Sequence, residues 1–228
     1  MALTLARVET PRGELVLRKA GEHFEVISNG VFLMDTRNGE SERLLVRAAL
    51  TRLQSNAAWR VLIGGLGVGF SLREALADER VARVTVVEIE ATIVDWHERH
   101  LRHLTGEARG DNRTEIVIAD IADLLQSSSA QYDAICLDID NGPDWTVSEA
   151  NTELYGDTGV ALLARRLNPD GVLTVWSAAG SATYVEVLGR HFGNVEVIEV
   201  PVARGAPDVV FVATNPVAQT LGRDSDSS

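Results

Sequence analysis

The stretch that decides the fold is residues 60–74, Arg60-Val61-Leu62-Ile63-Gly64-Gly65-Leu66-Gly67-Val68-Gly69-Phe70-Ser71-Leu72-Arg73-Glu74. Its apolar start is typical of a buried parallel strand, and the pattern after Ser71 is typical of a helix. The glycine turn Gly65-x-Gly67-x-Gly69 joins the two. Strand, glycine turn and helix together present backbone N–H groups and a helix N-terminus to a nucleotide-like ligand.

The glycine turn alone does not identify a ligand. In the dinucleotide pattern G-x-G-x-x-G the third glycine would fall at position 70, which is Phe70. A tight strand-to-helix turn without a ligand is an alternative explanation. The rest of the chain therefore has to decide between them.

Composition limits the class of protein. The chain has 228 residues, 45% of them hydrophobic and 24% charged, as expected for one globular domain with a small appendage. Its 21 Lys and Arg against 33 Asp and Glu give a formal net charge of −12. This charge disfavours nucleic acid as a partner and suits a small acceptor such as an amine. An acidic balance is also common for solubility alone.

The compartment can be predicted from what the sequence contains. Cys136 is the single cysteine, so no intramolecular disulfide can form, and we expect it to be a small buried hydrophobe. The first residues lack the pattern of a signal peptide, and no apolar segment is long enough to span a bilayer. We therefore expect a cytoplasmic protein without membrane contact.

Three regions are expected along the chain. Residues 1–40 alternate like a small antiparallel β meander, residues 41–214 form a Rossmann-like nucleoside-binding catalytic domain, and 215–228 are a polar, disordered tail. A helix over 41–53 should be capped by Ser41. The predicted strands are 61–64, 83–89, 114–119, 132–139, 172–177, 195–200 and 208–214. The predicted helices are 70–78, 91–104, 121–127, 149–167 and 181–192.

This alternation predicts an α/β fold with a doubly wound, mostly parallel seven-stranded sheet. The last two strands have no helix between them, so the final strand should be antiparallel. Ligands of such sheets bind beyond the carboxyl ends of the strands. The strands that follow the glycine turn end in Glu88, in Asp120, and in Asp138, which Asp140 and Asn141 follow closely.

Two ribose-binding ligand classes fit these acids, namely dinucleotides and sulfonium nucleosides of the S-adenosylmethionine type. The glycine spacing, the third-strand Asp120 and the antiparallel last strand favour the second. Together with residues 61–74, several segments resemble the spermidine synthase family, a branch of the class I methyltransferase fold. They are Val87-Glu88-Ile89-Glu90, Ala119-Asp120, Tyr132-Asp133-Ala134-Ile135-Cys136-Leu137-Asp138 and Leu167-Asn168-Pro169-Asp170-Gly171-Val172-Leu173. The resemblance covers most of residues 13–214.

The resemblance implies roles for particular residues. The catalytic residue would be Asp138, which orients and deprotonates an attacking amine. S-adenosylmethionine or its decarboxylated form would be bound, without a metal, by Gly65, Gly67, Gly69, Glu88, Ile89, Asp120 and Ile121. A homodimer would also be expected by this resemblance.

The polyamine half of the family pattern is altered. Val68 stands where the family has an aspartate that binds the aminopropyl amine, and Leu33 where it has a glutamine that helps bind the nucleoside. The family's tyrosine and acidic residues just beyond have no convincing counterpart within 38–42. Residues 139–145 replace its usual segment after the catalytic acid.

Several residues in and near the altered segment have two interpretations. Asp140 and Asn141 could orient a nitrogen or oxygen nucleophile, or they could belong to a simple Asn-Gly turn. Trp145 and Tyr155 could line an acceptor pocket, or they could pack a helix on the sheet. His97, His100 and His103 fall at three-residue steps and spread around a helix, which favours a solvated surface over a metal site.

The sequence therefore supports three hypotheses. The first is an S-adenosylmethionine-dependent transferase that methylates a small amine or other nucleophile, with Asp138 aided by Asp140 or Asn141. The alternative is an aminopropyltransferase that uses decarboxylated S-adenosylmethionine and a diamine. A second alternative is a nucleoside-binding protein that has lost catalysis.

Overall fold

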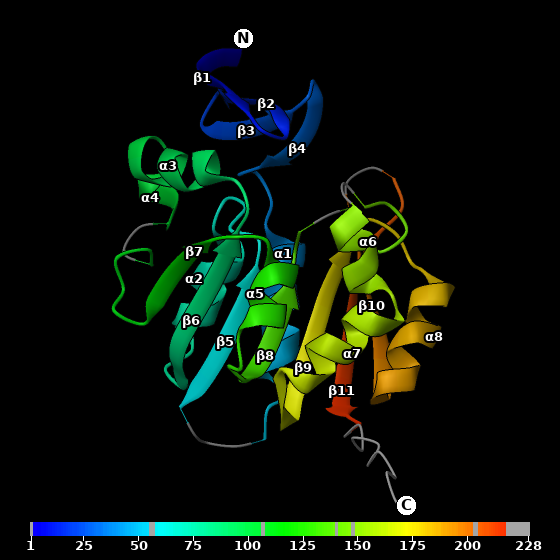
Figure 1. Cartoon of the computed structure of the whole chain (residues 1–228). Helices are drawn as coiled ribbons and strands as arrows, with labels where there is room; N and C mark the ends of the chain where they lie inside the picture. Colours follow the sequence, from blue (N-terminus) through cyan, green and yellow to red (C-terminus); the bar gives the residue numbers. More distant parts are fainter. Residues whose placement is uncertain are drawn as a thin grey trace, which may run out of the picture.

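A computed structural model describes residues 2–54, 58–105, 108–139, 141–146, 149–202 and 205–217. Within these ranges the chain forms a four-stranded and a seven-stranded sheet (Figure 1). The four-stranded sheet is an antiparallel meander in chain order, as predicted. Its strands are β1 (Ala2–Thr10), β2 (Gly13–Ala20), β3 (His23–Ser28) and β4 (Val31–Asp35).

The seven-stranded sheet has the order β10-β11-β9-β8-β5-β6-β7. Its strands are β5 (Trp59–Gly64), β6 (Val81–Glu88), β7 (Thr114–Ile118), β8 (Tyr132–Leu137), β9 (Leu167–Ser177), β10 (Phe192–Val200) and β11 (Asp208–Pro216). Neighbours from β9 to β7 are parallel, and β11 is antiparallel to both of its neighbours. The predicted doubly wound sheet and reversed last strand are confirmed. The strand order reverses at β5, which makes its carboxyl end the expected ligand position.

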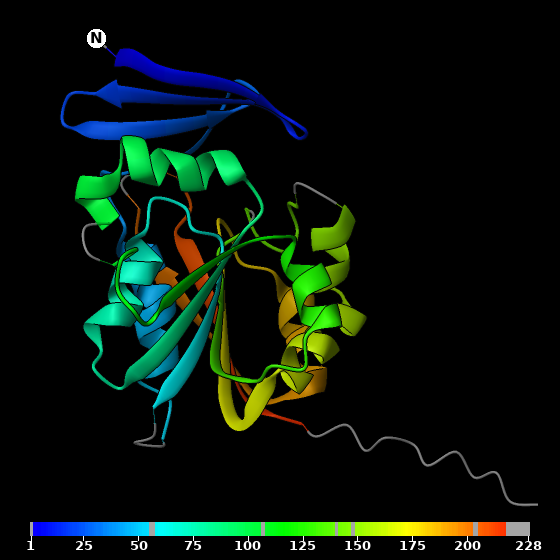
Figure 2. The same cartoon turned by 60° about the vertical axis from the view of Figure 1, so that its left-hand side comes forward.

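Helices cover both faces of this sheet (Figures 1 and 2). They are α1 (Glu40–Leu50), α2 (Phe70–Ala77), α3 (Ala91–Arg99), α4 (Arg102–Thr105), α5 (Ile121–Ser127), α6 (Glu149–Tyr155), α7 (Asp157–Arg165) and α8 (Ala182–His191). Val61 and Ile63 pack in the core with α1 and α2, whereas Leu62 packs in the core with α5, α7 and α8. Because side chains alternate along a strand, a strand buried on both faces needs an unbroken apolar run.

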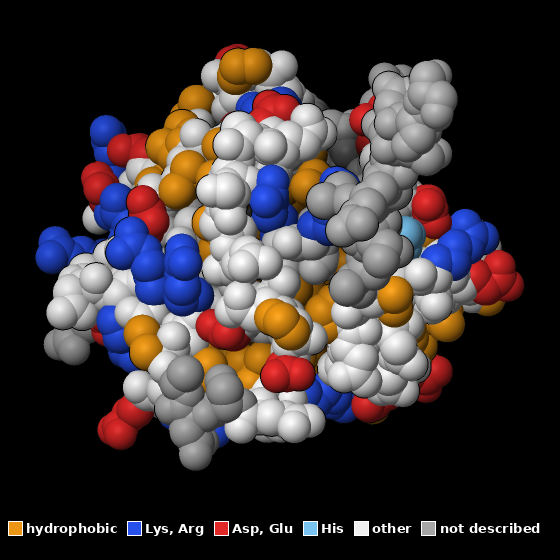
Figure 3. Space-filling model, turned by 60° about the horizontal axis from the view of Figure 1, so that its bottom comes forward, with side chains coloured by type: hydrophobic (Ala, Val, Ile, Leu, Met, Phe, Trp, Pro, Cys, Tyr) orange, Lys and Arg blue, Asp and Glu red, His pale blue; other side chains and the backbone are white. Residues whose placement is uncertain are grey.

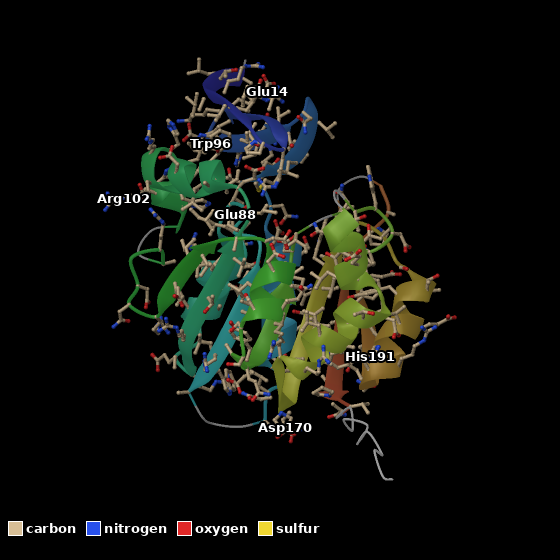
Figure 4. The ribbon with its side chains drawn as sticks, in the orientation of Figure 1. Glu14, Glu88, Trp96, Arg102, Asp170 and His191 are labelled. Atoms are coloured by element: carbon tan, nitrogen blue, oxygen red, sulfur yellow. The ribbon has the colours of Figure 1, made fainter. Side chains whose placement is uncertain are left out.

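The four-stranded sheet rests on α3. Leu17 and Phe24 of the sheet belong to the same buried core as Trp96 of α3. Trp96 lies between that helix and the sheet (Figure 4). Glu90, directly before α3, accepts hydrogen bonds from Thr10 and Arg12. The helix therefore joins the meander to the carboxyl ends of the parallel strands.

Some element boundaries differ from the prediction. The single helix expected over 149–167 is two helices separated at Gly156, whose ψ of 175° is extended. The helix expected over 91–104 ends at Arg99 and resumes as α4, because the His100 and Leu101 N–H groups both bond to the Trp96 carbonyl. Ser41 is not the cap of α1, which begins one residue earlier with Gly39 as its N-cap.

At the C-terminus, β11 extends to Pro216, beyond the expected strand end at 214. Residues 218–228 of the predicted tail lie outside the described residues. Among the described helices, none is long and apolar enough to cross a membrane.

Candidate active site

The glycine turn follows β5 directly. Gly65, Gly67 and Gly69 have φ values of 90°, 52° and 91°, a region that side-chain-bearing residues rarely adopt. A Cβ atom on Gly65 would lie 2.1 Å from the carbonyl oxygen of Asp138. The Asp138 N–H in turn donates to the Gly64 carbonyl at 2.9 Å. The turn therefore needs glycine at position 65, and it lies directly against the end of β8.

Glu88 ends β6 and supports the turn. Its side chain is buried, its Oε2 accepts a hydrogen bond from the Leu66 N–H at 2.9 Å, and its Oε1 accepts one from the Glu90 N–H at 2.8 Å. Burial raises the pKa of this carboxyl above its usual range. Figure 4 shows Glu88 at the carboxyl ends of the strands, below α3. Each carboxylate oxygen of Glu88 can accept a further hydrogen bond, so the two oxygens can also accept hydrogen bonds from ribose hydroxyls.

Asp120 and Ile121 lie at the neighbouring strand end. The Ala119 N–H donates to the Glu88 carbonyl at 3.1 Å, which places the end of β7 beside that of β6. Asp120 caps α5 by accepting a hydrogen bond from the Ala122 N–H. Ile121 is buried, and its Cδ1 would lie 2.8 Å from a Cβ on Gly64. The glycine turn, Glu88, Ile89, Asp120 and Ile121 thus share one edge of the sheet, and their ligand-binding roles stay a prediction.

Asp138 directly follows β8 at the same edge. Burial raises the pKa of its carboxyl to about 8, and repulsion from Glu42, Asp208 and Glu88 adds to the rise. We call these four side chains the acidic cluster: Glu42, Glu88, Asp138 and Asp208. A cation bound among them would favour the ionised form of Asp138 and lower its pKa.

Two members of the acidic cluster escaped the sequence analysis. Glu42 lies in the first turn of α1, and burial raises its pKa, with repulsion from Asp208 adding to the shift. Asp208 is the first residue of β11. Because β11 runs against its neighbours, it begins at the edge where the parallel strands end. The predicted reversal of the last strand, together with an acid at its start, is the signal that could have found Asp208.

The altered segment after β8 is held against the end of β9. Asp140 lies outside the described residues, whereas the Asn141 carbonyl accepts a hydrogen bond from the Ala178 N–H at 3.0 Å. A Cβ on Gly142 would lie 2.0 Å from Oγ of Ser177. The Trp145 N–H bonds back to the Gly142 carbonyl at 3.2 Å, which agrees with a turn. The role of Asn141 in orienting a nucleophile stays a prediction.

The two aromatic candidates have different surroundings. Tyr155 is buried, and its ring meets that of Tyr184 edge-on at 5.6 Å between centroids. Tyr155 belongs to the same buried core as Leu173 and Phe211 of the sheet, which agrees with the interpretation that it packs a helix on the sheet. Trp145 is 68% exposed, so packing on the sheet does not account for it.

The prediction that His97 lies on a solvated helix surface is wrong. This side chain is only 1% exposed, and its Nε2 lies 2.9 Å from the carbonyl oxygen of Gly67. His100 is half-buried, and His103 is exposed, with its ring near that of Phe24. Periodicity could not reveal the contact of His97, because its partner Gly67 comes from the glycine turn, thirty residues earlier in the chain. Among the described residues, no group of three or more His, Cys, Asp or Glu side chains is placed to hold a metal ion.

Away from the acidic cluster the charges are mixed. Lys and Arg side chains lie among Asp and Glu side chains on the face shown in Figure 3. A groove of about 620 Å³ runs between α5 and the outer strands, from Arg60 and Arg83 to Ala119. Its lining shares no residue with the acidic cluster. The carboxylates at the carboxyl edge are thus a local concentration.

Comparisons with known proteins agree with this geometry. The model of the spermine/spermidine synthase domain matches residues 42–192. A polyamine aminopropyltransferase of Ruegeria sp. (strain TM1040) is 32% identical over 163 residues, which are 67% of this chain and 55% of that protein. One from Synechococcus sp. (strain JA-2-3B'a(2-13)) is 30% identical over 159 residues, 68% of this chain and 48% of that protein. The chain thus spans about half the length of these curated relatives.

Solved structures show the same fold. A spermidine synthase in complex with the transition-state analogue AdoDATO has a TM-score of 0.77 and 17% identity, covering 94% of this chain and 74% of that one. The spermidine synthase of Thermotoga maritima has a TM-score of 0.74 and 16% identity, covering 94% and 73%.

Proposed function

Since this chain belongs to the spermine/spermidine synthase family, we propose that it transfers an aminopropyl group from decarboxylated S-adenosylmethionine to a small amine. From the sequence alone, methyl transfer is the first hypothesis and aminopropyl transfer is the alternative. The relatives are named polyamine aminopropyltransferases, which favours the alternative. The observation that carries the proposal is the acidic cluster around Asp138, beside the glycine turn.

Electrostatics favours the decarboxylated donor. S-adenosylmethionine carries a carboxylate, which the acidic cluster would repel. Its decarboxylated form carries a sulfonium and an ammonium but no carboxylate, so its charge is wholly positive. Unlike charges a few ångströms apart in a partly buried site attract by several kcal/mol at an effective dielectric constant of about 20. The same cluster suits an acceptor that carries a second ammonium group.

The proposed step uses Asp138 as the base. The acceptor nitrogen attacks the aminopropyl carbon bonded to sulfur, a C–N bond forms, and the C–S bond breaks with its electron pair going to sulfur. The sulfonium becomes a neutral thioether, 5′-methylthioadenosine, and the nitrogen passes its extra proton to the Asp138 carboxylate. The cationic donor and acceptor favour the ionised form of Asp138, which is the form that can accept this proton.

Carboxylates from other elements would replace the missing polyamine contacts. Val68, at the position of the family's amine-binding aspartate, is buried and uncharged, and Leu33 on β4 is 47% exposed. Glu42 and Asp208 both act electrostatically on Asp138. We propose that they bind the distal ammonium of the acceptor, which places the acceptor between α1 and the start of β11.

Calorimetry with the full chain tests the choice of donor. We expect decarboxylated S-adenosylmethionine to bind at least tenfold more tightly than S-adenosylmethionine, about 1.4 kcal/mol or more. With a diamine present, the decarboxylated donor should yield an aminopropylated product and 5′-methylthioadenosine. Tighter binding of S-adenosylmethionine with a methylated product would restore the first hypothesis. Nucleoside binding without product over a broad amine panel would support a protein that has lost catalysis.

The acceptor contacts have a separate test. Glu42→Gln and Asp208→Asn should each raise the KM for a diamine about tenfold, because each removes a charge-assisted contact of about 1.5 kcal/mol or more. The Kd for 5′-methylthioadenosine should change by less than about threefold. Glu40→Gln is the matched control, since Glu40 lies in the same turn of α1 with an exposed side chain. If the control raises the KM equally, the assignment of Glu42 is wrong.

A further inference from the structure

We infer that His97 is a positioning residue, which fixes the peptide group between Gly67 and Val68 in the orientation that nucleoside binding needs. The inference rests on the proposed function only in that the glycine turn holds an adenine nucleoside. His97 would touch neither substrate. It would act through the backbone of the turn.

The contact itself is short and buried. His97 lies on α3, is 1% exposed, and places Nε2 2.9 Å from the Gly67 carbonyl oxygen. A carbonyl oxygen can only accept a hydrogen bond, so Nε2 carries the proton and donates it. Burial lowers the pKa of His97 more than the Gly67 carbonyl raises it, which keeps the ring neutral at pH 7.

Fixing the carbonyl also fixes the next N–H group. The peptide bond is planar and trans, so the C=O of Gly67 and the N–H of Val68 point in opposite directions. With the carbonyl directed at α3, the Val68 N–H points away from that helix. A bound nucleoside would depend on the direction of the Val68 N–H, because backbone N–H groups of such a turn point at the ligand.

The turn is held at two points. On one side the Leu66 N–H donates to Oε2 of Glu88, and on the other the Gly67 carbonyl accepts from His97. Gly67 has a φ of 52° and, lacking a side chain, has wide conformational freedom. Without the His97 donor, the Gly67 carbonyl would lose its hydrogen bond. Rotation of the peptide group would let this carbonyl find another donor.

Two amide variants separate the hydrogen bond from the packing. In His97→Gln the side-chain NH₂ can occupy the position of Nε2, whereas in His97→Asn it lies one bond length short. We expect calorimetry with 5′-methylthioadenosine to give at least tenfold weaker binding for His97→Asn and binding within about threefold of the wild type for His97→Gln. His100→Gln, on the same helix, is the control and should bind like the wild type.

The two KM values distinguish a positioning role from a merely structural one, which would not change the KM for one substrate alone. In His97→Asn the KM for the nucleoside donor should rise about tenfold, while the KM for the diamine stays within about twofold. Wild-type affinity in His97→Asn would overturn the inference. So would a His97→Gln variant that melts like the wild type but binds as weakly as His97→Asn.

The proposed function and this inference fail in different ways. If the wild type binds 5′-methylthioadenosine but makes no aminopropylated product, aminopropyl transfer is wrong, and the binding series still decides the role of His97. If the wild type does not bind the nucleoside at all, both are overturned.

Discussion

Asp138→Asn is expected to reduce turnover about 10³-fold, the effect typical of removing a positioned general base. Asparagine keeps the shape of the side chain but cannot accept the proton that the acceptor nitrogen releases. The Kd for 5′-methylthioadenosine should stay within a few-fold of the wild type, because Glu88 and the glycine turn are unchanged. Single-turnover product formation and calorimetry measure the two quantities separately.

The same variant should be more stable than the wild type at alkaline pH. The folded-state pKa of Asp138, about 8, lies above its ordinary value of 3.8, so folding favours the protonated carboxyl. The contribution of this carboxyl to the free energy of unfolding is fully present below pH 3.8. It decreases as pH rises above 3.8 and is lost once pH has passed through 8. Above pH 8 the wild type therefore carries a buried repelled charge that Asp138→Asn lacks. A gain of about 1 kcal/mol would raise the melting temperature by roughly 2–4 °C for a chain of this size.

The difference in stability between the wild type and Asp138→Asn should depend on pH. The wild type and Asp138→Asn should differ in melting temperature at pH 9 and converge toward acid pH. A variant that is less stable at pH 9, or that retains more than a tenth of wild-type turnover, contradicts the role assigned to Asp138. Glu40→Gln again serves as the surface control.

Gly65→Ala is expected to destabilise the fold by about 3–5 kcal/mol. The φ of 90° alone costs an alanine roughly 1–2 kcal/mol. The new Cβ would also lie 2.1 Å from the Asp138 carbonyl oxygen, which is a backbone atom at the end of a central strand and cannot move without shifting β8. The melting temperature should fall by about 10 °C, because 1 kcal/mol corresponds to roughly 2–4 °C.

Gly67→Ala is the matched comparison. Its φ of 52° lies in the left-handed helical region, and the nearest atom to an added Cβ is Sδ of Met34 at 3.7 Å, an ordinary contact. The loss should be only about 1 kcal/mol. Urea denaturation of both variants measures the difference. Equal losses would mean that the close approach of Gly65 to the end of β8 is not what requires glycine there.

Much of the fold could be predicted because it depends on local patterns. The alternation of apolar runs with helical segments predicts the strands, and a helix between successive strands forces them to be parallel. The carboxyl ends then have to share one edge. For that reason the sequence pattern predicts that Glu88, Asp120 and Asp138 lie at the same edge of the sheet.

The parts that could not be predicted depend on contacts between distant segments. Glu42 and Asp208 come close to Asp138 only after α1 and the reversed β11 take their places. His97 has the spacing of a surface residue but is buried and contacts the Gly67 carbonyl of the glycine turn. The division of the long helix at Gly156 brings α6 close against α7, where a Cβ on Gly159 would lie 2.2 Å from the Leu154 carbonyl oxygen.

The reversal of β11 has an evolutionary consequence. The residues that we assign to nucleoside binding lie within 64–121, whereas the carboxylates that we assign to the acceptor come from α1 and from the start of β11, which flank the rest of the seven-stranded sheet in sequence. Mutations there could retune which amine is accepted while leaving the donor pocket intact. Under the proposed function, the connectivity of this chain thus separates the choice of acceptor from the binding of the nucleoside.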